Sequence, residues 1–224
     1  MSREPISDPV EFIRANTRLQ APPHVPEISL HLADEAMELW KLTEDQLETM
    51  GLPLPFWAFA WAGGQALARW VLDHPETVAG RTVLSFAAGA GLEAIAAVKA
   101  GATRVLATEI DPFALVALEL NAGMNGVSIG ITGTDVLETG LAGLPFRPDV
   151  VLLGDVFFER PLADRVAAFA AACVADGIET LVGDPGRSYL PRERMSELAE
   201  YRVPTTRALE DTEIKRTKVW RFLG

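Results

Sequence analysis

The residues best suited to chemistry lie where short apolar runs of the sequence end. The small-residue turn Ala87-Ala88-Gly89-Ala90-Gly91 follows the apolar run 82–86 and leads into a helical pattern. Small residues let a backbone approach a ligand closely, and the free N–H groups that begin a helix can bind it. Glu109 ends the next apolar run, where a carboxylate can accept hydrogen bonds from both hydroxyls of a ribose. Together the two segments predict a nucleoside cofactor bound by Ala88, Gly89, Gly91 and Glu109.

These residues alone leave the identity of the nucleoside open. Residues 89–94 (GAGLEA) fit the G-x-G-x-x-G/A pattern of NAD-binding proteins. Two features disfavour NAD: the extra small residues before the glycine pair, and the antiparallel hairpin expected at the end of the chain. A turn that binds no ligand is the remaining interpretation.

Alternating short apolar runs and helical patterns predict the elements that position these groups. Strands are expected at 82–86, 104–108, 128–132, 149–153 and 179–183, and helices at 65–72, 92–99, 112–121 and 161–175. This order is typical of a doubly wound parallel α/β sheet. A short helix is expected at 191–199. The runs 201–208 and 218–223 are joined by a turn too short for a crossover helix, so they are expected to pair antiparallel.

Residues 1–54 are predicted to form a helical extension in front of a domain that spans 55–224. An amphipathic helix is expected over 1–20, ended by the proline-rich stretch 21–26, with further helices around 32–40 and from Thr43. We expect this helical layer to cover one side of the cofactor cleft.

Composition narrows the class of protein. The chain has 224 residues, 49% of them apolar and 23% charged, which is the profile of one packed α/β domain. Its single cysteine, Cys173, cannot form an internal disulfide, and no apolar run approaches the ~20 residues of a membrane helix. The first residues are typical of neither a signal nor a transit peptide. We therefore expect a soluble, cytoplasmic protein that does not bind a membrane.

The net charge of −11 bears on the choice of partner. Phosphate backbones are bound by lysine and arginine, so an acidic chain is a poor candidate for nucleic-acid binding. A cationic partner, such as a protein that presents a lysine, would be attracted. The three histidines, His24, His31 and His74, have no ligand spacing between them, so no metal site is expected.

Five segments resemble the motifs of a known family. TVLSFAAGAG at 82–91 and LATEIDP at 106–112 look like the first two motifs of seven-strand S-adenosylmethionine methyltransferases. PFWAFAWAGGQAL at 55–67, LGDVFF at 153–158 and GDPGR at 183–187 are similar to protein lysine methyltransferases with an Asp-x-x-Phe/Tyr motif after strand four. The resemblance covers residues 55–224 and is greatest to the branch that modifies the electron transfer flavoprotein β subunit. It implies S-adenosylmethionine as cofactor, that subunit as partner, and a Rossmann-like fold.

The resemblance also implies roles for individual residues. Asp155 would orient the acceptor amine and Phe158 would line its channel, with Phe157 turned to the core. Asp135 would meet the adenine amino group, and Gly154 would also contact the cofactor. Trp61, which stands next to Gly63-Gly64, would form a wall of the cofactor site rather than Trp57. Two alternatives assign these residues no part in the chemistry: Asp155 could be the N-cap of the helix near Pro161, and Asp135 could be a solvated loop residue.

Two positions depart from the family pattern. Ser85 stands where the family usually has aspartate, and Ala87 stands where it usually has glycine. The first change removes a charge near the cofactor, and the second adds a methyl group where backbone and ligand are close. The alternative functions are a small-molecule or RNA methyltransferase, a nicotinamide-dependent dehydrogenase, and a non-catalytic nucleoside-binding module.

Overall fold

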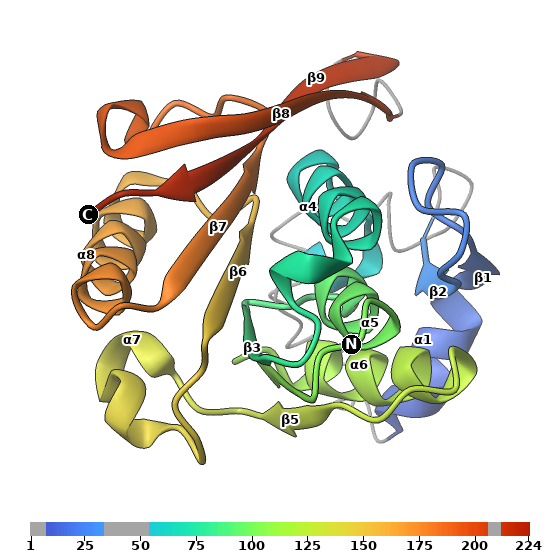
Figure 1. Cartoon of the computed structure of the whole chain (residues 1–224). Helices are drawn as coiled ribbons and strands as arrows, with labels where there is room; N and C mark the ends of the chain where they lie inside the picture. The colour runs from blue at the N-terminus through green and yellow to red at the C-terminus, as the bar shows by residue number, and fades with distance from the viewer. Residues whose placement is uncertain (1–7, 34–53, 206–211) are drawn as a thin grey trace.

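The computed structural model describes residues 8–33, 54–205 and 212–224 and contains a seven-stranded mixed sheet (Figure 1). The strand order is β5-β4-β3-β6-β7-β9-β8, in which the first five strands are parallel and β9 pairs antiparallel with both β7 and β8. The strands are β3 (Thr82–Phe86), β4 (Arg104–Thr108), β5 (Gly130–Thr132), β6 (Val150–Gly154), β7 (Glu179–Asp184), β8 (Met195–Pro204) and β9 (Ile214–Phe222). The predicted doubly wound sheet with an antiparallel C-terminal hairpin is confirmed.

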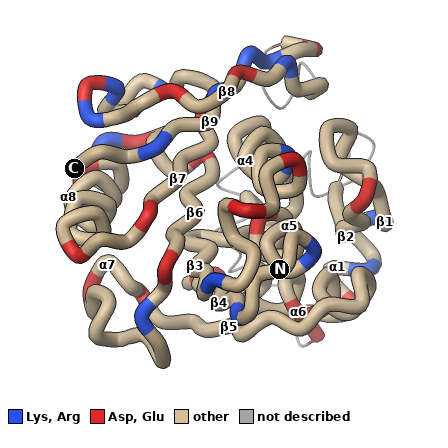
Figure 2. Tube along the Cα trace, viewed as in Figure 1, with Lys and Arg blue, Asp and Glu red and all other residues tan. Residues whose placement is uncertain are grey.

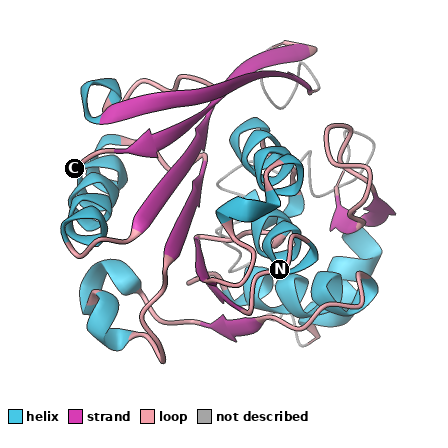
Figure 3. Cartoon of the chain, in the orientation of Figure 1, coloured by secondary structure: helices cyan, strands magenta, loops and turns pink. Residues whose placement is uncertain are grey.

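Helices cover both faces of this sheet (Figure 3). The helices of the sheet domain are α4 (Ala62–Asp73), α5 (Leu92–Lys99), α6 (Pro112–Met124), α7 (Val136–Thr139) and α8 (Arg160–Ala175). One apolar core joins α4 and α5 to the sheet, and a second joins α7 and α8 to its other face. The central strands β3 and β6 are mostly apolar because both of their faces are covered. Short 3₁₀ turns complete the chain: η1 (Phe56–Ala58), η2 (Pro75–Thr77), η3 (Leu141–Gly143) and η4 (Arg192–Arg194).

The prediction of a helix over 1–20 is confirmed only in part, and it is wrong for residues 17–20. Helix α1 spans only Pro9–Asn16, with Asp8 as its N-cap, and Thr17 after it is extended. Strand β1 (Arg18–Gln20) then pairs antiparallel with β2 (Leu30–Leu32). Backbone pairing across the proline-rich turn therefore replaces the later part of the expected helix. Two further predicted helices, around 32–40 and from Thr43, lie outside the described residues, except for positions 32 and 33 of the first.

The helix expected at 191–199 is also wrong. Only the 3₁₀ turn η4 forms there, and strand β8 begins at Met195. The register of β8 against β9 shifts between Glu197 and Ala199, which marks a β-bulge. A bulge inserts an extra residue and breaks the period-two pattern, so the first part of this strand does not look like one in the sequence.

The N-terminal segment shares its core with the sheet domain. Val25, Ile28 and Leu30 are completely buried in the same cluster as α4 and α5. On α6, Asn121 Oδ1 accepts a hydrogen bond from the backbone N–H of His31 at 2.8 Å. These contacts hold the described N-terminal residues against the domain, while the predicted boundary at residue 54 stays a prediction.

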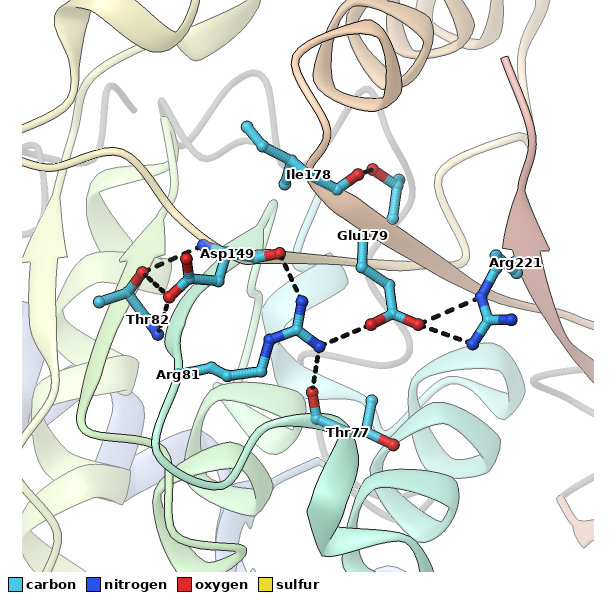
Figure 4. A network of polar contacts seen from close by, with 8 residues as sticks. Thr77, Arg81, Thr82, Asp149, Ile178, Glu179 and Arg221 are labelled. Carbon is cyan, nitrogen blue, oxygen red and sulfur yellow. Dashed lines mark hydrogen bonds and ion pairs between the residues drawn. The ribbon is translucent and has the colours of Figure 1, made fainter.

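A polar network fastens the amino ends of the parallel strands (Figure 4). Arg81, just before β3, donates to the Glu179 carboxylate at 2.6 Å and to the Asp149 carbonyl at 3.0 Å. Arg221 of β9 donates to the other Glu179 oxygen at 2.8 Å, and Asp149 accepts from the Thr82 backbone N–H at 2.8 Å. The network lies at the end of the sheet opposite the predicted site, so its role is to hold strands together.

Charged residues of both signs alternate along the β8–β9 hairpin (Figure 2). Arg216 pairs with Glu200 at 2.9 Å and Lys218 with Glu197 at 2.6 Å across the two strands. Basic residues near the C-terminus are thus partly neutralised. Among the helices that the structure describes, none has the length and apolar character needed to cross a membrane.

Candidate active site

The turn between β3 and α5 is built from left-handed backbone conformations. Ala87, Gly89 and Gly91 have φ values of 47°, 51° and 88°. At Gly91 a side chain is excluded twice, since φ is positive and a Cβ would lie 2.6 Å from Leu118 Cδ2. Ala87 adopts such a conformation despite its Cβ, at a cost of roughly 1–2 kcal/mol. Residues 87–90 of this turn line a pocket, and their small side chains leave the backbone accessible from it.

Glu109 joins this turn to the end of β4, as the sequence predicts. Its Oε1 accepts a hydrogen bond from the Gly89 N–H at 3.0 Å, and its Oε2 accepts one from the Ile110 N–H at 2.9 Å. Burial raises the pKa of Glu109, although the backbone N–H bonds oppose the shift. Oε2 also accepts a hydrogen bond from the Asp111 N–H at 3.3 Å, whereas Oε1 keeps a second acceptor site to which a hydroxyl group of a ligand can bind.

Asp155 follows β6 and lines the same pocket, whereas Glu109 and Gly91 are not among the residues that line it. Its φ is 57°, and 9% of the residue is exposed. Oδ2 accepts a hydrogen bond from the Gly64 N–H, in the first turn of α4, at 2.8 Å. The N-cap of α8 is Glu159, so the alternative of Asp155 as a cap for the helix near Pro161 is wrong. Instead its carboxylate satisfies one of the free N–H groups that begin α4.

The other oxygen of Asp155 holds a cation against an aromatic ring. Arg187 Nη2 donates to Asp155 Oδ1 at 2.8 Å, and the Arg187 guanidinium lies 5.7 Å from the centre of the Trp61 ring. Asp184 positions this arginine, because its Oδ1 accepts from the Gly186 and Arg187 N–H groups at 2.6 and 2.7 Å. The sequence analysis names the GDPGR segment but does not foresee the ion pair, which joins residues 32 positions apart.

Phe56 and Trp61 line the pocket, and Phe158, which is not among its lining residues, packs against Phe56. Phe158 is 41% exposed, and its ring centre lies 5.4 Å from that of Phe56. Trp61 Nε1 donates to the Phe56 carbonyl at 2.9 Å. Phe157 and Trp57 are buried, at 0% and 2% exposure, which confirms that one member of each aromatic pair belongs to the core.

Glu93 is the member of the site that sequence reasoning missed. It lies in the first turn of α5, and burial raises its pKa to about 7. It lines one pocket together with Trp61, Gly64, Gly154, Asp155 and residues 87–90. The signal was present in the sequence: Glu93 is an acid in the otherwise apolar stretch Leu92–Val98 of a helix that packs on the sheet.

Asp135 lies outside the lining of that pocket as the described residues form it. Its Oδ1 accepts from the Leu137 N–H at 2.9 Å and caps α7, and its Oδ2 lies 3.5 Å from Arg165 Nη2. The expected contact with adenine stays a prediction.

Within the described residues, no group of three or more His, Cys, Asp or Glu side chains is arranged to hold a metal ion.

Comparisons with known proteins agree with this geometry. Residues 69–151 match the ribosomal protein L11 methyltransferase family. A crystal structure of ribosomal protein L11 methylase from Lactobacillus delbrueckii subsp. bulgaricus shares the fold, with a TM-score of 0.50 and 20% identity over 74% of this chain and 81% of that one.

Two curated relatives match nearly the whole chain. The electron transfer flavoprotein β subunit lysine methyltransferase of Danio rerio is 36% identical over 94% of this chain and 82% of its own length. The protein of the same name from Homo sapiens is 32% identical over 94% of this chain and 80% of its own length. Because the identity exceeds 30% over most of both chains, the chain belongs to the family of electron transfer flavoprotein β subunit lysine methyltransferases.

Proposed function

We propose that the protein transfers methyl groups from S-adenosylmethionine to lysine side chains of the electron transfer flavoprotein β subunit. Its relatives at 32–36% identity carry that activity in their names. The net charge of −11 supports a cationic protein partner over RNA. We also propose that the reaction takes place in the cytoplasm, as expected from the composition.

The residues around the β3–α5 turn fit S-adenosylmethionine. The turn offers backbone beside small side chains, and Glu109 offers carboxylate oxygens at the end of the neighbouring strand. Glu93, a buried carboxyl in the same pocket, suits the positively charged end of that molecule. When bound, S-adenosylmethionine supplies an activated methyl group on its sulfonium. We assign Ala88, Gly89, Gly91, Glu109 and Gly154 to holding it, with Trp61 as a wall and Asp135 near the adenine.

One observation carries the assignment of lysine as the acceptor: the Arg187 guanidinium held between Asp155 and Trp61. A carboxylate 2.8 Å from a guanidinium nitrogen and an aromatic ring 5.7 Å from the guanidinium carbon form a cation-binding position. A lysine ammonium has the same charge and can use the same partners. Phe56, which lines the pocket, and Phe158 beside it suit its aliphatic stem.

The chain must also deliver lysine in its neutral form. The pKa of an unperturbed lysine is ~10.4, so the ammonium has to lose a proton before its nitrogen can react. Aromatic side chains that exclude water disfavour the charged form, and Asp155 can accept a hydrogen bond from the amine and hold its lone pair in line. The aromatic faces also suit the cationic methylated product.

The decisive experiment is methylation of the purified β subunit by the purified chain, read by mass spectrometry. We expect mass gains in steps of one methyl group on lysine, absent without S-adenosylmethionine and much reduced with Asp155→Asn. In a second experiment, the chain is incubated with a cell extract and S-adenosylmethionine labelled on its methyl group. If a protein other than the β subunit takes up the label on lysine, the proposed substrate is wrong and the proposed lysine methyltransferase activity stands. Label in RNA alone would contradict the proposal.

A further inference from the structure

Glu93 brings a second carboxyl into the pocket of Asp155. It is only 9% exposed, yet it lines the pocket with Trp61 and Asp155. Its carboxylate accepts a hydrogen bond from its own backbone N–H and from no other residue that the structure describes. A buried carboxyl without an external partner is costly, so its position calls for a ligand.

Two glycines make room for this side chain. A Cβ on Gly64 would lie 3.0 Å from Glu93 Oε1, and a Cβ on Gly154 would overlap the same oxygen. Gly64 lies within α4, where glycine costs about 0.5–1 kcal/mol relative to alanine. A glycine in α4 and a glycine at the end of β6 thus both leave space for the Glu93 carboxyl group.

The charged groups of the surrounding elements are engaged elsewhere. Asp155 pairs with Arg187, and Glu109 accepts backbone N–H groups at the end of β4. On α4, Arg69 pairs with Asp73 at 2.8 Å in the second half of the helix. None of these charges contributes to the raised pKa of the α5 carboxyl, which is due to its burial.

The chemistry of the carboxyl selects the group that it would bind. With a pKa of about 7, Glu93 is divided between its neutral and ionised forms at neutral pH, and a neighbouring cation would favour the ionised form. S-adenosylmethionine carries two positive groups, a sulfonium and an α-ammonium. The ammonium has N–H donors for the unpartnered carboxylate, and the sulfonium has none.

We propose that Glu93 is the counter-ion that binds the α-ammonium group at the methionine end of the cofactor. The inference rests on the proposed function, because it takes S-adenosylmethionine as the ligand. Binding would ionise Glu93, and the protein would release the proton that the neutral carboxyl carries.

Proton release on binding is measured by titration calorimetry at pH 6.5 in two buffers of different ionisation enthalpy. At this pH the ligand's α-amino group, with an ordinary pKa of ~7.7–8.0, is already protonated. A carboxyl with a pKa of about 7 is then roughly three-quarters neutral. We expect release of about 0.7 proton with S-adenosylmethionine and with S-adenosylhomocysteine, since both carry the ammonium.

Glu93→Gln should abolish this release while the protein stays folded by thermal melting. The matched control is Glu119→Gln, an exposed glutamate on α6, which should release as much as wild type. Release with S-adenosylmethionine alone would point to the sulfonium and overturn the inference, as would equal release from Glu93→Gln. If both ligands bind without proton release, the role of Glu93 falls and the proposed function stands. If neither ligand binds, the proposed function fails as well.

Discussion

Replacing Asp155 with asparagine tests the residue that the site depends on most. Asparagine tolerates the left-handed backbone at φ 57°, so the loop conformation should survive. Its one amide oxygen can accept from either Gly64 or Arg187, and its NH₂ group must face the other donor. Losing one charge-assisted hydrogen bond at a position only 9% exposed should cost about 1.5–3 kcal/mol of stability. For a chain of 224 residues this lowers Tm by about 3–12 °C.

The effect on catalysis should be larger than the effect on stability. If Asp155 orients the acceptor amine, single-turnover methyl transfer should fall by about 10²-fold or more at a temperature where the variant is folded. Calorimetry with S-adenosylmethionine should give a Kd near that of wild type. Asp8→Asn is the matched control, because Asp8 is an exposed cap of α1 that does not line the pocket, and asparagine caps equally well.

Two outcomes would refute this reasoning. Near-normal turnover despite a lower Tm would mean that Asp155 only holds α4 and Arg187 in place. Loss of cofactor binding in parallel with turnover would mean that it acts on the cofactor rather than on the amine.

Three further changes test other parts of the structure. Glu109→Ala should weaken S-adenosylmethionine binding by about 1–3 kcal/mol in calorimetry, the cost of leaving hydroxyl groups without a partner. Phe158→Ala should raise KM for the protein substrate several-fold with little change in Tm, because the ring is 41% exposed and supports no core contact of its own. Burial raises the pKa of Glu179, but hydrogen bonds from the two arginines of Figure 4 outweigh it and leave a net lowering. Glu179→Gln should therefore cost about 1 kcal/mol in urea unfolding at neutral pH, and the difference from wild type should shrink once the pH falls below ~4.3, the ordinary pKa of glutamate, and vanish below the lowered pKa of the folded state.

Much of the sheet could be predicted because its signals are local. Strands β3 and β4 have the expected bounds, since each is a short apolar run between turn residues. Helix α6 begins at Pro112 after the Asp111 cap, a start signal contained in two adjacent residues. Strand β8 could not be predicted over its whole length, because its bulge depends on pairing with a strand that comes later in the chain.

The site could be predicted only in part, for the same reason. The turn 87–91 and Glu109 lie twenty residues apart on neighbouring strands, and the topology of the fold brings them together. The contact between Asp155 and Gly64 spans 91 residues, and no pattern within either segment indicates it. Arg187 likewise reaches Asp155 from the next strand end, through a loop whose shape Asp184 fixes.

The structure gives a physical reason for the glycine at position 154. The resemblance assigns it, as part of the LGDVFF segment, to the cofactor site. The structure adds that a Cβ at this position would overlap the Glu93 carboxylate, and that Gly64 leaves space on the other side. Ser85 leaves the end of β3 without the carboxylate that the family pattern has there, while Glu93 brings one into the pocket from α5. A glycine at 154 and an acid at 93 therefore form one unit, and a side chain at 154 should displace the carboxyl as effectively as removing it.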